Sequence, residues 1–141
     1  CNTSKEQSVE SFFGNVISTY TRAQAIEDGV LVDAGPMAEE AGFTGPVALT
    51  SAVWEDCVAW TDLDSERQVY QNQSGRLWDV LSMAGFAIRA NPSTSNQLLY
   101  ELYRVPRDGH STKAQLVQLK LIIGLGDHDE IVMTILNPSE D

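Results

Sequence analysis

Two segments in the middle of the chain carry apolar residues at the spacing of an α-helix. The first begins at Thr50 or Ser51, either of which is a good N-cap, and continues to about Trp60. The second covers residues 75–89 and has a set of apolar positions at the same spacing: Leu77, Trp78, Leu81, Ala84 and Ile88. We expect these segments to form the two main helices and to pack against each other.

In the last third of the chain the apolar positions alternate instead, which is the spacing of a β-strand. Strands are expected over 97–105, 115–124 and 130–137. Turn residues separate the first two segments, and the polar stretch 125–130 predicts a hairpin loop between the last two.

Capping residues mark shorter elements near the N-terminus. Thr21 and Gln24 have the spacing of a capping box, and a glycine follows at a helix-terminating position, so a short helix is predicted over 22–28. A short strand is expected over 30–33, and a second short helix over 36–41.

These elements predict an α+β fold. We expect a small antiparallel sheet of three or more strands, mainly C-terminal, packed against the two main helices, with the short capped helices near the N-terminus. Residues 1–11 are polar and lack periodicity, so they are expected to form a disordered tail. Residues 12–141 are then a single domain, long enough to build one hydrophobic core.

Composition excludes several classes of protein. Hydrophobic residues make up 43% of the chain and charged residues 21%, which is ordinary globular usage. The longest apolar stretches, such as 119–125, are much shorter than the roughly 18 residues that a transmembrane helix requires. No membrane partner is therefore expected.

The chain is strongly acidic, with a formal net charge of -11. Such a chain repels nucleic-acid phosphates, so direct nucleic-acid binding is not expected, and a basic protein is the favoured partner. The alternative, that the acidity only maintains solubility, stays open.

Two cysteines are present, and they do not form a C-x-x-C pair. Cys57 lies among apolar helical neighbours and is interpreted as a small buried hydrophobe. Cys1 precedes a polar run and could be the mature end of a lipid-anchored protein. We favour the interpretation that Cys1 is not native and that the protein is cytoplasmic, with the lipid anchor as the alternative.

The densest group of possible metal ligands is the segment "GDHDE", which contains Asp127, His128 and Asp129. Consecutive residues of a hairpin tip rarely surround one ion, so we interpret them as solvated turn residues and expect no metal. Glycine-rich nucleotide loops and a G-x-S-x-G nucleophile motif are also missing from the sequence, so no cofactor is expected.

Two functional hypotheses remain. A binding protein would use exposed carboxylates together with some of the large aromatic residues: Trp60, Tyr70, Trp78, Tyr100 and Tyr103. A small enzyme or ligand-binding domain would instead bring Arg22, Glu27, Arg76 and Asp79 together in a pocket between helices and sheet. The candidate binding residues are therefore these four and Tyr70, which lies in a polar segment; the non-enzymatic hypothesis is preferred, and no catalytic residue is assigned.

Several segments, in order along the chain, resemble those of a known family. They include "VISTYTRAQAIEDGVLVD", "QSGRLWDVL" and "LKLIIGLGDHDEIVMTILNPSED". The chain is similar to an uncharacterised domain family of short acidic bacterial proteins carried largely on plasmids and other mobile elements. The resemblance implies a bacterial cytoplasmic protein without an established activity, and it suggests an accessory or anti-defence factor of a mobile element that acts on a protein partner.

Overall fold

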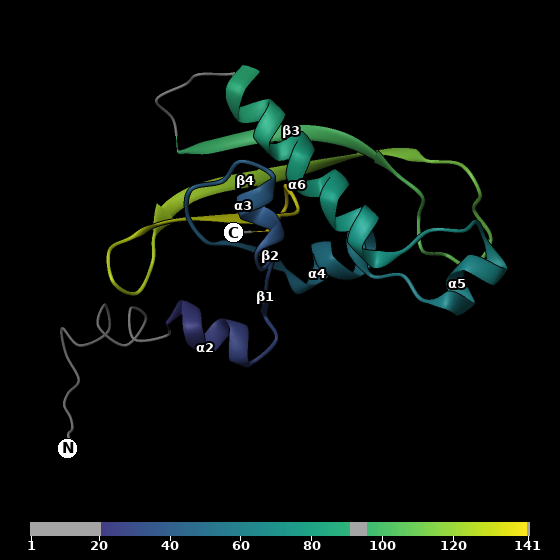
Figure 1. The fold of residues 1–141 in the computed structure, drawn as a ribbon, viewed down its shortest axis with the longest axis horizontal. Helices are drawn as coiled ribbons and strands as arrows, with labels where there is room; N and C mark the ends of the chain where they lie inside the picture. Colours follow the sequence, from purple (N-terminus) through teal and green to yellow (C-terminus); the bar gives the residue numbers. More distant parts are fainter. Residues whose placement is uncertain (1–20, 91–95, 141) are drawn as a thin grey trace.

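One five-stranded sheet forms the centre of the molecule (Figure 1). The computed structural model describes residues 21–90 and 96–140, so the expected tail over 1–11, including Cys1, lies outside the described residues. Across the sheet the strands lie in the order β1-β2-β5-β4-β3. Their bounds are β1 (Leu31–Asp33), β2 (Val47–Thr50), β3 (Gln97–Arg104), β4 (Gln115–Leu125) and β5 (Ile131–Leu136).

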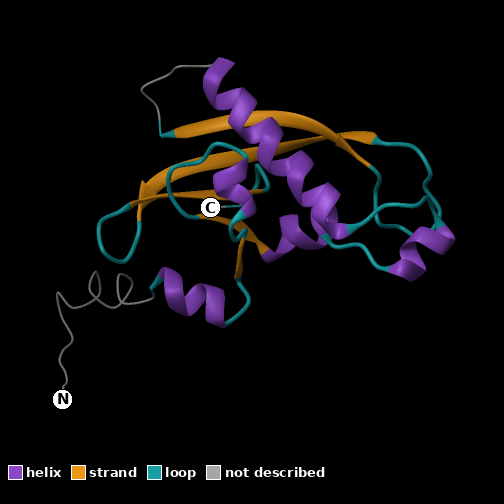
Figure 2. Cartoon of the chain, in the orientation of Figure 1, coloured by secondary structure: helices purple, strands orange, loops and turns teal. Residues whose placement is uncertain are grey.

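A long helix, α6, crosses in front of β3 and β4, and the other described helices are short (Figures 1 and 2). The helical elements are α2 (Arg22–Glu27), α3 (Met37–Glu40), α4 (Ser51–Val53), the π-helix η1 (Trp54–Val58), α5 (Asp62–Arg67) and α6 (Gln73–Ala90). In the part of the chain that the structure describes, no helix combines the length and the apolar character needed to cross a membrane.

The sheet is mixed. β1 pairs with β2, β5 with β4 and β4 with β3 in antiparallel fashion, but β2 and β5 run parallel, with Ala48 beside Thr134. After β2, the chain passes through α4, η1, α5 and α6 before it returns to the sheet at its far edge as β3.

The expected fold class is wrong in two respects. The sheet is neither small nor purely antiparallel, because β1 and β2 from the first half of the chain complete it and β2 runs parallel to β5. The expected pair of main helices reduces to one, α6. β2 escaped prediction because its first three residues are all buried, so its sequence shows no alternation.

The first expected main helix is short because its hydrogen bonding changes. Thr50 caps it as expected, with its side chain accepting a bond from the Val53 amide. From Trp54 the chain forms a single π-helical turn, and at Ala59 the backbone becomes extended, with ψ 131. A π-helical turn is most often a local insertion in a helix and does not extend it.

The core lies between α6 and the face of the sheet that α6 covers. Leu119, Leu121 and Ile135 of the sheet are fully buried there, as are Val80 and Leu81 of α6. The prediction that α6 would bury a stripe of apolar residues is confirmed for Leu77, Leu81 and Ala84 but is wrong for Trp78, which is 41% exposed.

Candidate functional site

The five residues expected to bind a ligand do not converge. Tyr70 is 87% exposed in the connection before α6. Glu27 is exposed at the end of α2. Arg22 lies on α2 as well and bonds to the β4–β5 hairpin and to β5, while Arg76 and Asp79 lie on α6. A single pocket built from these residues is therefore not present.

Arg22 and the "GDHDE" segment, which the sequence presents as separate candidates, bind each other. The Asp127 carboxylate accepts bonds from the backbone amides of Arg22, at 2.9 Å, and Ala23, at 3.1 Å. The Arg22 guanidinium donates to Thr134 Oγ1 at 2.9 Å and to the carbonyl oxygen of Met133 at 2.7 Å. Asp127 thus satisfies the first amides of α2, and Arg22 attaches the helix to β5.

The remaining residues of the segment also have local roles. Asp129 has a positive φ of 64° in the turn, and the Glu130 carboxylate accepts a bond from the His128 amide at 2.9 Å. Within residues 21–90 and 96–140 no group of three or more histidine, cysteine, aspartate or glutamate side chains is placed to hold a metal ion.

The bonds to Asp127 lead to a prediction about acid stability. The backbone amides of Arg22 and Ala23 hold the pKa of the Asp127 carboxyl below its ordinary value. A carboxyl whose pKa is lower in the folded state stabilises the fold above its unfolded pKa, and the stabilisation is lost as the pH falls through the folded pKa. Asp127→Asn is therefore expected to lower the melting temperature at neutral pH, and less so as the pH falls below about 4.

Thermal unfolding of the wild type and of Asp127→Asn, followed by circular dichroism from neutral pH to below about pH 4, measures the difference in melting temperature. Asp129→Asn is the matched control, because it changes the same charge in the same hairpin outside these two contacts. A difference between wild type and Asp127→Asn that is independent of pH would contradict the assignment.

Arg76 is a structural cation. It is 3% exposed, and its guanidinium donates to the carbonyl oxygens of Val58 at 3.1 Å, Val105 at 2.9 Å and Asp56 at 2.9 Å. It also lies 4.5 Å from the centre of the Trp60 ring. Two of these carbonyls belong to η1, so Arg76 caps the C-terminal end of that π-helix.

Beside Arg76 is a small cavity of about 110 Å³, which Asp79, Gln71 and Arg104 also line. Gln71 Nε2 and Arg104 Nε are buried and have no hydrogen-bond partner in the part of the chain that the structure describes. Cys57 lines the same cavity, and burial raises the pKa of its thiol to about 12. The thiol is therefore protonated at neutral pH and is a poor nucleophile.

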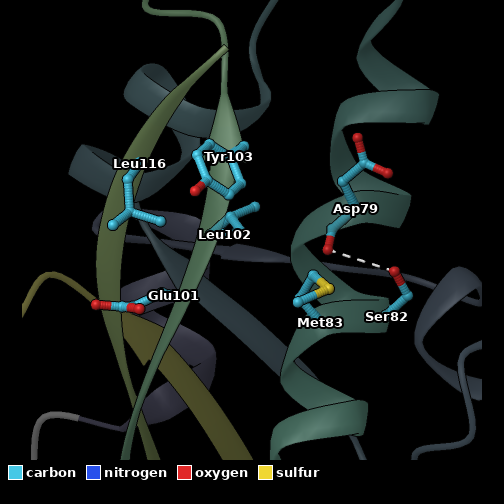
Figure 3. Close-up of a pocket in the computed structure, with 7 residues that line it drawn as sticks. All are labelled: Asp79, Ser82, Met83, Glu101, Leu102, Tyr103 and Leu116. Atoms are coloured by element: carbon cyan, nitrogen blue, oxygen red, sulfur yellow. Dashed lines mark hydrogen bonds between the residues drawn. The ribbon is translucent and has the colours of Figure 1, made fainter.

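A larger cavity lies between α6 and the outer edge of the sheet. It has a volume of about 460 Å³, and Figure 3 shows α6 side chains on one side of it and those of β3 and β4 on the other. The lining residues are Asp79, Ser82, Met83, Glu101, Leu102, Tyr103 and Leu116. Burial raises the pKa of the Asp79 carboxyl above its ordinary value, and nearby Arg76 acts in the opposite direction.

A neighbouring cavity of about 310 Å³ continues along β3, and it shares Met83 and Glu101 with the larger one. We call the two cavities together the α6–β3 groove. Large apolar side chains remain exposed around it, among them Phe86 at 59% and Tyr103 at 67%. Of the aromatic residues expected to form a binding surface, Tyr103 is exposed at the groove, whereas Trp60 and Tyr100 are buried.

The groove has the apolar character of a binding surface. Among the described residues that line it, the titratable side chains are Asp79, Tyr100, Glu101 and Tyr103, and none is a lysine or an arginine. His110 and His128 lie in the β3–β4 and β4–β5 connections and are not among the lining residues. A nucleophile with a histidine base is therefore not assembled here.

Most residues of the groove were absent from the sequence-based candidates, although a signal for them exists. Leu98 and Leu99 are adjacent, and so are Leu102 and Tyr103, so this strand is apolar on both faces. A strand with only one covered face would alternate with polar residues. In the same way, Met83 and Phe86 lie outside the buried stripe of α6.

The comparisons with known proteins give one match. The model of a family of unknown function, DUF6573, matches residues 9–141. No curated protein and no solved structure matches the chain.

Proposed function

The chain belongs to the family of unknown function DUF6573, and because membership brings no activity with it, we propose from the geometry that it is a non-enzymatic protein that binds a protein partner through the α6–β3 groove. The observation that carries the proposal is the concentration of exposed apolar side chains along this groove. They are Met83 and Phe86 of α6, Leu99 and Tyr103 of β3, and Leu116 of β4.

Exposed apolar surface of this kind needs an explanation. Soluble monomers rarely leave a large contiguous apolar patch in water, and such patches mark interaction sites. The groove adds a concave shape and flexible Met83, which adapts to a partner surface. Asp79 and Glu101 supply a polar rim, as protein interfaces do.

The charge of the groove supports a basic partner. The chain carries a net charge of -11, and the groove residues within 21–90 and 96–140 include Asp79 and Glu101 but no lysine or arginine. Association with a basic protein would be steered by this charge and weakened by salt. The setting implied by the family resemblance, a bacterial cytoplasmic accessory factor of a mobile element that acts on a host protein, is the finer form of this proposal.

The test places a charge in the apolar part of the groove. A peptide selected from a displayed random library against the wild-type protein serves as the probe, and fluorescence polarisation measures its affinity. Met83→Glu with Phe86→Glu is expected to weaken binding at least about 10-fold, because apolar anchors carry most of the energy at an interface. The two side chains are partly exposed, so the fold should tolerate the change.

Leu63→Glu is the matched control, since Leu63 is an exposed leucine of α5 and does not line the groove. Equal affinities for wild type and the double variant would overturn the proposal. So would an equal loss with Leu63→Glu, because binding would then depend on charge alone.

A second function is favoured by the small cavity beside Arg76. Two buried donors, Gln71 Nε2 and Arg104 Nε, have no partner among the described residues, and they suit a small oxygen-containing ligand such as a carboxylate. A gain in melting temperature with formate or acetate that is absent from Arg104→Leu would favour this ligand-binding function over the first.

A further inference from the structure

β3 forms an edge of the sheet, and β4 is its one partner strand among the described residues. It is eight residues long, whereas the opposite edge strand, β1, has three residues. A long edge strand presents a row of backbone groups that can pair with another chain, so natural sheets usually protect it with proline, a bulge or charge. β3 has no proline, and its pairing with β4 is continuous from Gln97 to Arg104.

The register of the ladder determines which backbone groups point away from the sheet. The Ile123 amide donates to the carbonyl oxygen of Asn96 at 2.8 Å, so this pair is hydrogen-bonded. Hydrogen-bonded and non-hydrogen-bonded pairs alternate in an antiparallel ladder. The amides and carbonyls of Leu99, Glu101 and Tyr103 therefore point away from β4.

The α6–β3 groove runs beside these outward groups. A segment paired with β3 would direct alternate side chains to opposite faces. One set would lie toward α6, next to Met83 and Phe86, and the other set would lie beside Leu99 and Tyr103. Both rows are apolar and exposed, as an added strand requires.

Charge complementarity identifies the occupant. Asp79 and Glu101 line the groove together with Ser82, and none of the described residues that line either cavity is a lysine or an arginine. The Asp79 carboxylate is partly desolvated, so a nearby cation would stabilise it. A second copy of this chain fits poorly, because each copy carries a net charge of -11 and brings another Glu101 to the same edge.

We propose that the partner binds by strand addition: an extended segment with alternating apolar side chains pairs with the outward backbone groups of Leu99, Glu101 and Tyr103, and a lysine or arginine in its row beside Leu99 and Tyr103 lies against Glu101. This inference rests on the proposed function and specifies how the groove recognises its partner.

The first test separates the backbone of Glu101 from its side chain. Glu101→Pro removes an amide that the β3–β4 ladder does not use, and proline is tolerated on an edge strand. It is expected to weaken binding of the selected peptide at least about 10-fold, because it removes one main-chain bond and hinders the approach of a strand. Glu101→Gln keeps the amide and is expected to weaken binding about 2- to 5-fold.

A second peptide, in which glutamine replaces the basic residue of the selected peptide, tests the contact between that residue and the Glu101 carboxylate. Its affinity is expected to be the same for wild type and Glu101→Gln. An equal effect of Glu101→Gln on both peptides would overturn the assignment of the cation.

Amide hydrogen exchange gives a measurement that needs no variant. On addition of the peptide, the amides of Leu99, Glu101 and Tyr103 should exchange more slowly, because they become hydrogen-bonded. Unchanged exchange at all three positions would overturn strand addition.

The outcomes distinguish the two proposals. If the Met83 and Phe86 double variant loses the peptide while Glu101→Pro binds it normally, strand addition is wrong and the proposed function stands. If the library yields no peptide that binds the groove, both are overturned. If sedimentation shows a dimer that Glu101→Pro dissociates, the occupant is a second copy, and the basic segment is wrong.

Discussion

Replacing Arg76 by alanine is expected to lower the free energy of unfolding by about 3–5 kcal/mol. Three carbonyl oxygens, those of Asp56, Val58 and Val105, would lose a charged donor in a buried place. The Trp60 ring would lose the cation that lies over it. These groups join η1, α6 and the end of β3, so the loss affects the attachment of three elements at once.

Urea denaturation followed by circular dichroism measures the effect. Arg76→Lys keeps the charge but cannot place donors toward all three carbonyls, so it is expected to recover only part of the stability. Arg67→Ala is the control, because Arg67 is an exposed arginine on α5, and a change within about 0.5 kcal/mol is expected there. A loss below about 1 kcal/mol for Arg76→Ala would show that water replaces the guanidinium.

The elements predicted correctly are those whose signals are local. Thr21 and Gln24 do form a capping box on α2, and the 18-residue α6 covers the segment with the most regular helical spacing. The hairpin between β4 and β5 lies where polar residues interrupt two alternating segments. In each case, neighbours within a few residues supply the interaction that the element needs.

The parts that escaped prediction depend on distant residues. β2 pairs with the three-residue β1 and, in parallel, with β5, which lies more than eighty residues away in the chain. The role of Arg76 also depends on distant residues, because its acceptors come from η1 and from Val105, directly after β3. A charged residue in a sequence looks available, and only the fold shows that its donors are already used.

The candidate site illustrates the same limit. Asp79 is the one sequence-based binding candidate that lines the α6–β3 groove. The rest of that groove consists mainly of apolar residues, which periodicity assigns to the core by default. Leu99 and Tyr103 are accessible because they alternate with the buried Tyr100 and Leu102 along β3 and so lie on its other face.

Gly45 tests the mixed sheet directly, and Gly45→Ala is expected to destabilise the protein by about 2–3 kcal/mol. A Cβ atom at this position would collide with the carbonyl oxygen of Ile131, at the start of β5. The next residue, Pro46, accepts a bond from the Met133 amide at 3.0 Å, so the backbone cannot withdraw without loosening the contact between β2 and β5.

Gly124→Ala is the matched control, because Gly124 lies in β4 of the same sheet and a Cβ atom there would meet no other atom within 4 Å. Alanine should be neutral or slightly stabilising at that position, since it loses less conformational entropy on folding. Chemical denaturation of both variants compares them. The parallel pairing of β2 with β5 requires a loss of stability for Gly45→Ala alone. Equal effects of the two substitutions would contradict the close approach of residue 45 to β5, and with it the parallel pairing.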